Sequence, residues 1–321
     1  MTRRATSQPR RLGPSRLDLS VRLGSLQLRN PVMIASGLAG YGDELEGIVN
    51  LGKIGAVVTK TLTLNAREGN APPRLAEAHS GLMNSIGLAN VGCQAFISRR
   101  LRHLKALKTK IVVSVGGFSE REYGEIVLRL EDAGGFDGFE INISCPNVKE
   151  AGMSFGCSPA GAAGVVRAVR PKTSRSIIVK LTPNVTDIAL IARACVSEGA
   201  DALTVGNTFK ALAVDVQTRR PLLGGGTGGL SGPAIKVLSL AKVWEVVSAV
   251  SVPVIACGGI CCSNDALEFI VVGATALQVG SACLRNLRTP ELVLAGIEEY
   301  CRNNRVRSLA EMRGTVKSPE L

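Results

Sequence analysis

The sequence predicts an α/β fold: a (β/α)8 TIM barrel with an N-terminal β-hairpin and inserted loops at the C-terminal face of the barrel. Two observations favour this class. Short apolar runs recur along the 321 residues with helical patterns between most of them, and aromatic residues make up only 3% of the chain. A core of Val, Ile, Leu and Ala is typical of parallel strands covered by helices. A doubly wound sheet is the alternative, but no Gly-x-Gly-x-x-Gly motif follows the first strand.

Eight apolar runs predict short buried strands, because strands covered on both faces lack the polar alternation of half-exposed ones. The runs are Val32–Ser36, Ile54–Lys60, Ile111–Val115, Gly138–Ile143, Ile177–Leu181, Ala202–Val205, Val254–Cys257 and Ala276–Val279. This number favours closure into a barrel, since a doubly wound sheet usually has fewer strands in one domain.

Helical patterns with start and stop signals separate most of these strands. Glu120–Gly134 follows Ser119, a predicted N-cap, and Glu122 is placed to complete a capping box. Pro233–Val250 opens on a proline, which the first turn of a helix tolerates. The other predicted helices are Asp187–Gly199, Asn264–Val272 and Pro290–Cys301.

The N-terminal part of the chain has two further features. Asp18–Leu28 alternates apolar and polar residues around Gly24-Ser25, which is typical of a β-hairpin. Residues 1–16 contain five arginines and no acidic residue, and so carry much of the net charge of +12. We expect this segment to be a basic disordered tail without a nucleic-acid partner, and residues 17–321 to form a single domain.

Composition also indicates the compartment. No run approaches the ~18 consecutive apolar residues that a membrane helix needs, so we expect no membrane contact. The nine cysteines are odd in number and include no Cys-x-x-Cys pair, which favours reduced, buried thiols over disulfides or a metal site. A cytoplasmic location is therefore expected.

Glycine turns after the last two predicted strands indicate a phosphate site. Gly258-Gly259 follows the seventh strand and Gly280-Ser281 follows the eighth. In barrels, the loops after these strands commonly bind phosphate through backbone N–H groups, and glycine allows a close approach. Two long connections, Thr61–Asn90 and Thr208–Ser231, are expected to complete the site, because loops at strand carboxyl ends usually carry it.

Polar side chains gather at the same ends of the predicted strands. Lys60 follows the second strand and Lys180 lies within the fifth, and a buried lysine needs an anion or an electron-rich ring beside it. Beside a flavin, Lys180 would stabilise the charge that develops on reduction. Neutral amides match the donors and acceptors of a pyrimidine-like ring. Four asparagines lie at this rim: Asn84, Asn142, Asn147 and Asn207.

Cys145 is the best-placed candidate for a general base. It lies between Asn142 and Asn147, just past a predicted strand. The chain has only two histidines: His79 lies in the first long connection and His103 in a basic helical pattern. A free thiol has a pKa near ~8.5, so a modest fall makes it a usable base at neutral pH.

These residues resemble the class 1 dihydroorotate dehydrogenases, and within them the class 1B catalytic subunit that works with NAD. The similarity extends from about Leu17 to Glu299. It rests on Asn30-Pro-Val-Met33, Ala35-Ser-Gly37, Lys60-Thr61, Asn84-Ser-Ile-Gly-Leu88, Asn142-Ile-Ser-Cys-Pro-Asn-Val-Lys149, Lys180-Leu-Thr-Pro-Asn-Val-Thr-Asp187, Asn207-Thr208, Thr227-Gly-Gly-Leu-Ser-Gly-Pro-Ala-Ile-Lys236, Gly258-Gly-Ile260 and Gly280-Ser281.

The resemblance implies that FMN lies across the barrel mouth. Its phosphate would be bound by Gly232, Gly258, Gly259, Gly280 and Ser281, and the rest of the cofactor by Ser36, Lys60, Thr61, Ser114, Asn142, Lys180 and Gly206. Dihydroorotate would stack on the flavin and bind Lys60, Asn84, Asn142, Asn147, Asn207 and Thr208, helped by the backbone of Ser85, Ile86, Gly87 and Leu88. Cys145 would take the C5 proton while a hydride leaves C6, which yields orotate for pyrimidine synthesis.

The resemblance also implies partners. Class 1B chains are expected to form a homodimer and to pair with an iron–sulfur flavoprotein that carries FAD and a [2Fe–2S] cluster, giving a heterotetramer. That subunit would pass electrons to NAD. The sequence contains no dinucleotide fingerprint and no cluster ligands, in agreement with the need for such a subunit. The membrane-bound class 2 enzymes use serine as the base, so Cys145 argues against them.

Three alternatives stay open. Class 1A relatives use fumarate, although the segment from Lys149 to Gly156 resembles class 1B. A related flavin reductase would act on another pyrimidine, such as uracil. A catalytically reduced flavin-binding subunit is the third, because Ser114 stands where the family usually has an asparagine and so lacks an amide toward the flavin.

Overall fold

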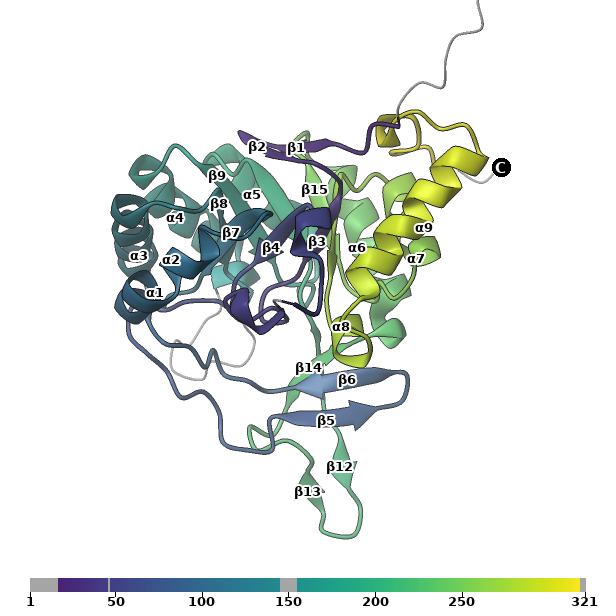
Figure 1. The fold of residues 1–321 in the computed structure, drawn as a ribbon. Helices are drawn as coiled ribbons and strands as arrows, with labels where there is room; N and C mark the ends of the chain where they lie inside the picture. The colour runs from purple at the N-terminus through teal and green to yellow at the C-terminus, as the bar shows by residue number, and fades with distance from the viewer. Residues whose placement is uncertain (1–16, 46, 145–154, 318–321) are drawn as a thin grey trace, which may run out of the picture.

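The structure of the chain is a computed structural model that describes residues 17–45, 47–144 and 155–317 (Figure 1). Its central strands are β3 (Val32–Ile34), β4 (Ala56–Val58), β7 (Lys110–Val115), β8 (Gly138–Asn142), β9 (Ser176–Leu181), β10 (Ala202–Val205), β15 (Val254–Cys257) and β16 (Ala276–Val279). Neighbouring strands pair in parallel and close into a barrel in the order β10-β15-β16-β3-β4-β7-β8-β9. The predicted barrel and its eight strands are confirmed, the last three with the predicted bounds.

Helices surround the barrel (Figure 1). The longer ones are α3 (Glu120–Ala133), α4 (Pro159–Val169), α5 (Ile188–Ser197), α6 (Lys236–Val247), α7 (Ser263–Val272) and α9 (Thr289–Asn303), and the shorter ones are α1 (Cys93–Arg99), α2 (Leu101–Leu104) and α8 (Ala282–Arg285). Sequence patterns did not predict α4, whose first half has no large apolar side chain. None of the helices in the described residues is long and apolar enough to cross a membrane.

Local capping explains where α3 begins. The Ser119 hydroxyl accepts a hydrogen bond from the Glu122 N–H (3.2 Å), as an N-cap does. The Glu122 carboxylate accepts from the Phe118 N–H (2.8 Å), so the reciprocal bond of the predicted capping box is shifted by one residue. The predicted helical stretch Pro233–Val250 does begin at Pro233, but its first turn, Pro233–Ile235, is a 3-10 helix, and α6 continues from there to Val247.

The predicted hairpin seals one end of the barrel. β1 (Val21–Leu23) pairs with β2 (Leu26–Leu28). Their apolar side chains pack against the inward-facing side chains of the barrel, namely Met33, Ala56, Val58, Val112, Ile178, Ala202, Ile255 and Ala276. The Ser176 hydroxyl fixes the hairpin by accepting from the Leu26 N–H (2.9 Å) and donating to the Leu23 carbonyl (2.7 Å). This seal leaves the opposite end, where the strands have their carboxyl ends, for a site.

The two long connections form a second sheet at that opposite end (Figure 1). Its strands are β5 (Leu75–Ala78), β6 (Gly81–Asn84), β11 (Phe209–Ala211) and β14 (Gly228–Ser231). They pair in the antiparallel order β11-β14-β6-β5, and we call this the cover sheet. Between β11 and β14, a hairpin of β12 (Val214–Asp215) and β13 (Arg220–Pro221) extends away from the barrel.

Candidate active site

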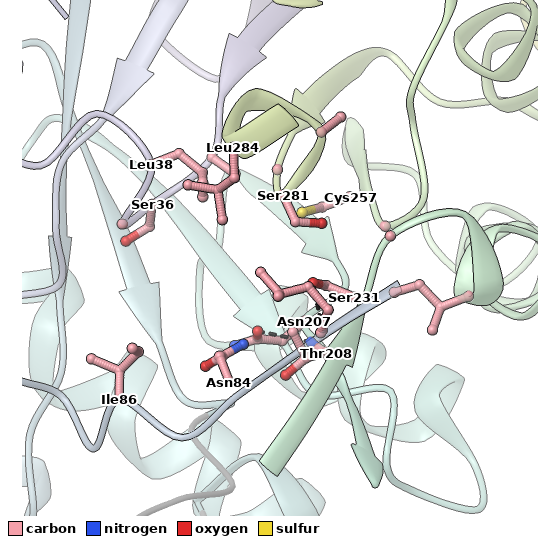
Figure 2. A pocket seen from close by; sticks show the side chains of 18 of the residues that line it. Ser36, Leu38, Asn84, Ile86, Asn207, Thr208, Ser231, Cys257, Ser281 and Leu284 are labelled. Atoms are coloured by element: carbon pink, nitrogen blue, oxygen red, sulfur yellow. Dashed lines mark hydrogen bonds between the residues drawn. The ribbon is translucent and has the colours of Figure 1, made fainter. Parts of the chain in front are cut away.

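A cavity of about 330 Å³ lies between the carboxyl ends of the barrel strands and the cover sheet. Its volume is within the range of small-molecule sites. The predicted ligand-binding residues that line it are Ser36, Lys60, Thr61, Asn84, Ile86, Gly87, Leu88, Asn142, Lys180, Asn207, Thr208, Gly232, Gly258, Gly259, Gly280 and Ser281 (Figure 2). The fold therefore brings residues from both long connections and from the strand ends into one space.

Three other predicted site residues, Ser85, Ser114 and Gly206, are described by the structure and do not line this cavity. Cys145 and Asn147 lie outside the described residues. Ser85 is 1% exposed and is covered by its neighbours. Gly206 continues the pairing of β10 with β15, because its N–H donates to the Cys257 carbonyl (2.9 Å). Ser114 is also fully buried.

The two glycine turns form a cradle of backbone N–H groups. Gly259 has a φ of 77°, and a Cβ there would lie 2.6 Å from the Lys236 backbone. A Cβ on Gly280 would meet nothing within 4 Å, because that side faces the cavity. In the described part of the chain, no acceptor takes the N–H groups of Gly258, Gly259, Gly280 and Ser281. Unpaired N–H groups around an open space suit a phosphate.

A carboxylate fixes the turn after β15. Asp265 accepts hydrogen bonds from the N–H groups of Cys261 (2.9 Å) and Cys262 (3.2 Å). Lys236, at the start of α6, pairs with Asp265 (3.0 Å) and with Glu268 (2.9 Å). Burial opposes the charged carboxylate, but these N–H groups and the ammonium outweigh it and hold the pKa of Asp265 below its ordinary value. The turn is thus held from both flanking helices while its glycine N–H groups stay available.

A buried polar network occupies the barrel interior at the cavity. Lys180 is 5% exposed, and its Nζ lies 3.3 Å from Gln278 Oε1 and 3.8 Å from Glu140 Oε1. The other Glu140 oxygen accepts from Gln278 Nε2 (2.6 Å) and Thr204 Oγ1 (3.2 Å). Burial opposes the charge on Lys180, but Glu140 and then Cys257 raise the pKa of this lysine above its ordinary value. A charged ammonium therefore lines the cavity at neutral pH.

A second network joins the amides at the rim. The Ser144 hydroxyl donates to Asn142 Oδ1 (2.7 Å) and accepts from Asn207 Nδ2 (2.7 Å). Asn142 Nδ2 donates to Thr61 Oγ1 (3.3 Å), which lies 2.9 Å from Ser114 Oγ. These contacts fix the orientation of both amides before any ligand binds. They also link the buried Ser114 to the cavity through Thr61.

Four members of these networks were missed by the sequence patterns: Glu140, Gln278, Thr204 and Ser144. Glu140 and Gln278 interrupt strands that are otherwise apolar, and a polar residue in a fully buried strand was the available signal. Their partnership was hidden because they are 138 residues apart in the chain. Ser144 gave no comparable signal, since serine is common beside turns.

The barrel, the glycine cradle, and the cavity lined by lysine and amides are typical of (β/α)8 barrels that bind a phosphate-bearing cofactor such as a flavin. A family model described as dihydroorotate dehydrogenase matches residues 18–300. The chain belongs to the dihydroorotate dehydrogenase family, which is a family of flavin-dependent oxidoreductases.

Curated relatives agree with the family match. The chain is 48% identical to the "dihydroorotate dehydrogenase B (NAD(+)), catalytic subunit" of Geotalea daltonii, over 94% of this chain and 98% of that protein. It is 47% identical to the protein of the same name from Geobacter metallireducens, over 94% and 99% of the two chains. The relative from Desulforamulus reducens has the same name and is 46% identical, over 94% and 99%. The match thus covers nearly the full length of these relatives.

Replacing Asp265 with asparagine should lower the free energy of unfolding at neutral pH by about 1–2 kcal/mol, because a charged helix cap and the ion pair with Lys236 are lost. The pKa of Asp265 is depressed in the folded protein, so its stabilisation is present above the unfolded pKa and is lost as the pH falls through the folded value. Urea unfolding at about pH 7 and about pH 2.5 measures both the loss of stability in the variant and its dependence on pH.

The free energies of unfolding of the wild type and of Asp265→Asn should differ at neutral pH and become equal in acid. Glu245→Gln is the matched control, since it breaks an exposed pair with Lys242 (2.9 Å) and should change stability by less than about 0.5 kcal/mol. A difference for Asp265→Asn that persists undiminished in acid would show that the charge of Asp265 is not what stabilises the turn.

Proposed function

We propose that this chain oxidises dihydroorotate to orotate, a step of pyrimidine synthesis, with FMN bound in the cavity. One observation carries the proposal: a phosphate cradle and a surface of lysine and amide groups line the same continuous space. The names of the curated relatives support this substrate over other pyrimidines.

FMN suits the cradle because it ends in a single phosphate. The N–H groups of Gly258, Gly259, Gly280 and Ser281 would bind that phosphate. The charged Lys180 would face the pyrimidine end of the flavin ring, where negative charge collects on reduction. When bound, the flavin accepts the hydride that leaves C6 of dihydroorotate.

The rim residues match the substrate. The ammonium of Lys60 would pair with the carboxylate of dihydroorotate, and the amides of Asn84, Asn142 and Asn207 would bind its ring N–H and C=O groups. Asn142 and Asn207 are already oriented by Ser144, so binding costs less ordering of side chains. This preorganisation supports a small, planar, amide-containing substrate.

We assign removal of the C5 proton to Cys145, which follows Ser144 directly in the chain. The assignment rests on the sequence, because Cys145 lies outside the described residues. Loss of the C5 proton to the thiolate and of the C6 hydride forms the C5=C6 bond of orotate, so atoms and electrons balance. Asn142 and Asn207 hold the ring while the thiolate accepts the proton.

We further propose that electrons leave through a second subunit, an iron–sulfur flavoprotein with FAD and a [2Fe–2S] cluster, and reach NAD. The words "NAD(+)" and "catalytic subunit" in the names of the relatives support such a subunit. A homodimer within a heterotetramer is the proposed assembly. Exposed apolar side chains on and beside the β12–β13 hairpin, Leu212, Val214 and Val216, support a protein interface there.

The thiols support a cytoplasmic location. The eight cysteines of the described residues are free. Burial raises the pKa of the Cys195 thiol to about 12, and burial likewise raises the pKa of Cys283 to about 12, so these thiols are unreactive. Reduced, buried thiols are typical of proteins in a reducing compartment.

The purified chain should bind FMN and turn yellow, and anaerobic addition of dihydroorotate should bleach the flavin absorbance. Absorbance spectroscopy with dihydroorotate and dihydrouracil in parallel checks both the cofactor and the substrate. Bleaching by dihydrouracil alone would redirect the proposal to another pyrimidine. A colourless protein that cannot be reconstituted with FMN would refute it.

Cys145→Ser should slow flavin reduction by dihydroorotate about 10²-fold or more at neutral pH, because a serine hydroxyl ionises far less readily than a thiol and so leaves almost no anionic base. Stopped-flow absorbance measures the rate. Cys157→Ser is the matched control, since Cys157 is an exposed free thiol that does not line the cavity, and it should leave the rate unchanged. An undiminished rate for Cys145→Ser would remove Cys145 from the role of base.

A further inference from the structure

We propose that Glu140 is a positioning residue for the flavin reaction: it holds the Lys180 ammonium in place at the cavity and keeps it charged, and so sets how strongly the protein stabilises reduced flavin. This inference rests on the proposed function. It concerns a residue of the barrel interior that no ligand would touch, since Glu140 does not line the cavity and is 0% exposed.

The geometry of Glu140 points toward Lys180. One carboxylate oxygen is satisfied by Gln278 Nε2 (2.6 Å) and Thr204 Oγ1 (3.2 Å). The other, Oε1, has no hydrogen-bond partner among the described residues, although it is fully buried. Its neighbour is the Lys180 ammonium, at 3.8 Å. A buried carboxylate oxygen without a hydrogen bond is costly, and the attraction to Lys180 is what offsets that cost.

The geometry of Lys180 leaves one donor for a ligand. An ammonium has three N–H donors. One is used by Gln278 Oε1 (3.3 Å), and a second direction faces Glu140. Because Lys180 also lines the cavity, the third N–H can point to an acceptor on the flavin ring. Glu140 lies on β8 and Gln278 on β16, and the two side chains are hydrogen-bonded to each other while both face Lys180. The direction of the third N–H is therefore fixed by two strands of the barrel.

Glu140 also decides the charge state of Lys180. Burial alone would lower the pKa of this lysine, and the negative charge of Glu140 is the main cause that reverses the shift. Gln278 and Thr204 carry no charge, and burial raises the pKa of the Cys257 thiol, so that group stays neutral. Among the described residues that line the cavity, Lys60 is the other one with a charged side chain. Glu140 is therefore the one full negative charge, among the described residues, that stabilises the charged form of Lys180.

Removing the negative charge should make Lys180 titrate in an accessible range. In Glu140→Gln the burial cost remains while the attraction is lost, so the pKa of Lys180 falls. Below that pKa, the Lys180 ammonium of the variant has no counter-charge, and the variant should stabilise reduced flavin more than the wild type does. Above it, a neutral amine should favour reduced flavin less. The variant therefore acquires a pH-dependent step in the flavin potential that the wild type lacks.

The test is the midpoint potential of bound FMN from about pH 6 to about pH 10, measured by photoreduction against a reference dye, which needs no substrate. In Glu140→Gln the affinity ratio of reduced to oxidised flavin should change about tenfold or more across the step, equal to about 30 mV or more for a two-electron couple. Thr204→Val removes a hydrogen bond from Glu140 but keeps both charges, so it should show no step. A Glu140→Gln potential that tracks the wild type at every pH would overturn the proposal.

A second variant covers the case in which Glu140→Gln does not fold. Replacing both partners, Glu140→Gln with Lys180→Met, leaves no buried charge uncompensated, so this double variant should fold as stably as the wild type in urea. A double variant no more stable than the single one would show that Glu140 acts independently of Lys180, against the proposal. Failure of wild-type protein to be bleached by dihydroorotate would instead count against the proposed substrate, and the potential measurement would still stand.

Discussion

The buried pair of Lys180 and Glu140 is the constraint on which the site depends. An ammonium at 5% exposure is unfavourable unless an anion faces it, and the facing carboxylate lies on the neighbouring strand. Gln278, which bonds to both, comes from the far end of the chain. The network therefore forms only when the barrel has closed, and closure delivers a positive charge to the cavity in a fixed place.

The rest of the architecture separates an apolar end of the barrel from a polar one. At one end, the β1–β2 hairpin packs against apolar side chains of the barrel interior and is fixed there by the Ser176 hydroxyl. At the other end, glycine turns leave N–H groups unpaired and Ser144 orients two amides. The cover sheet completes this space with Asn84 from β6. Phosphate affinity and amide recognition thus arise from different segments that meet only in the folded chain.

Sequence patterns predicted the fold well where one type of residue is enough to identify a strand or a turn. Apolar runs located the barrel strands, and Gly258-Gly259 and Gly280-Ser281 located the two turns of the cradle. Gly258 and Gly259 have positive φ angles, which favour glycine. These patterns did not predict residues whose role depends on a partner far away in the sequence. Glu140 looks like an isolated acid in an apolar run until Lys180 and Gln278 surround it. The strands of the cover sheet were also missed, because they are short and pair across two separate connections.

In the proposed function, one cavity holds FMN and orients it between the glycine cradle and Lys180. A crystal structure of the chain with FMN and orotate tests it most directly. The phosphate should lie on the N–H groups of Gly258, Gly259, Gly280 and Ser281. The edge of the flavin ring should lie beside the Lys180 ammonium, and orotate should lie against Asn142 and Asn207. A flavin bound outside this cavity, or one whose ring lies away from Lys180, would contradict it.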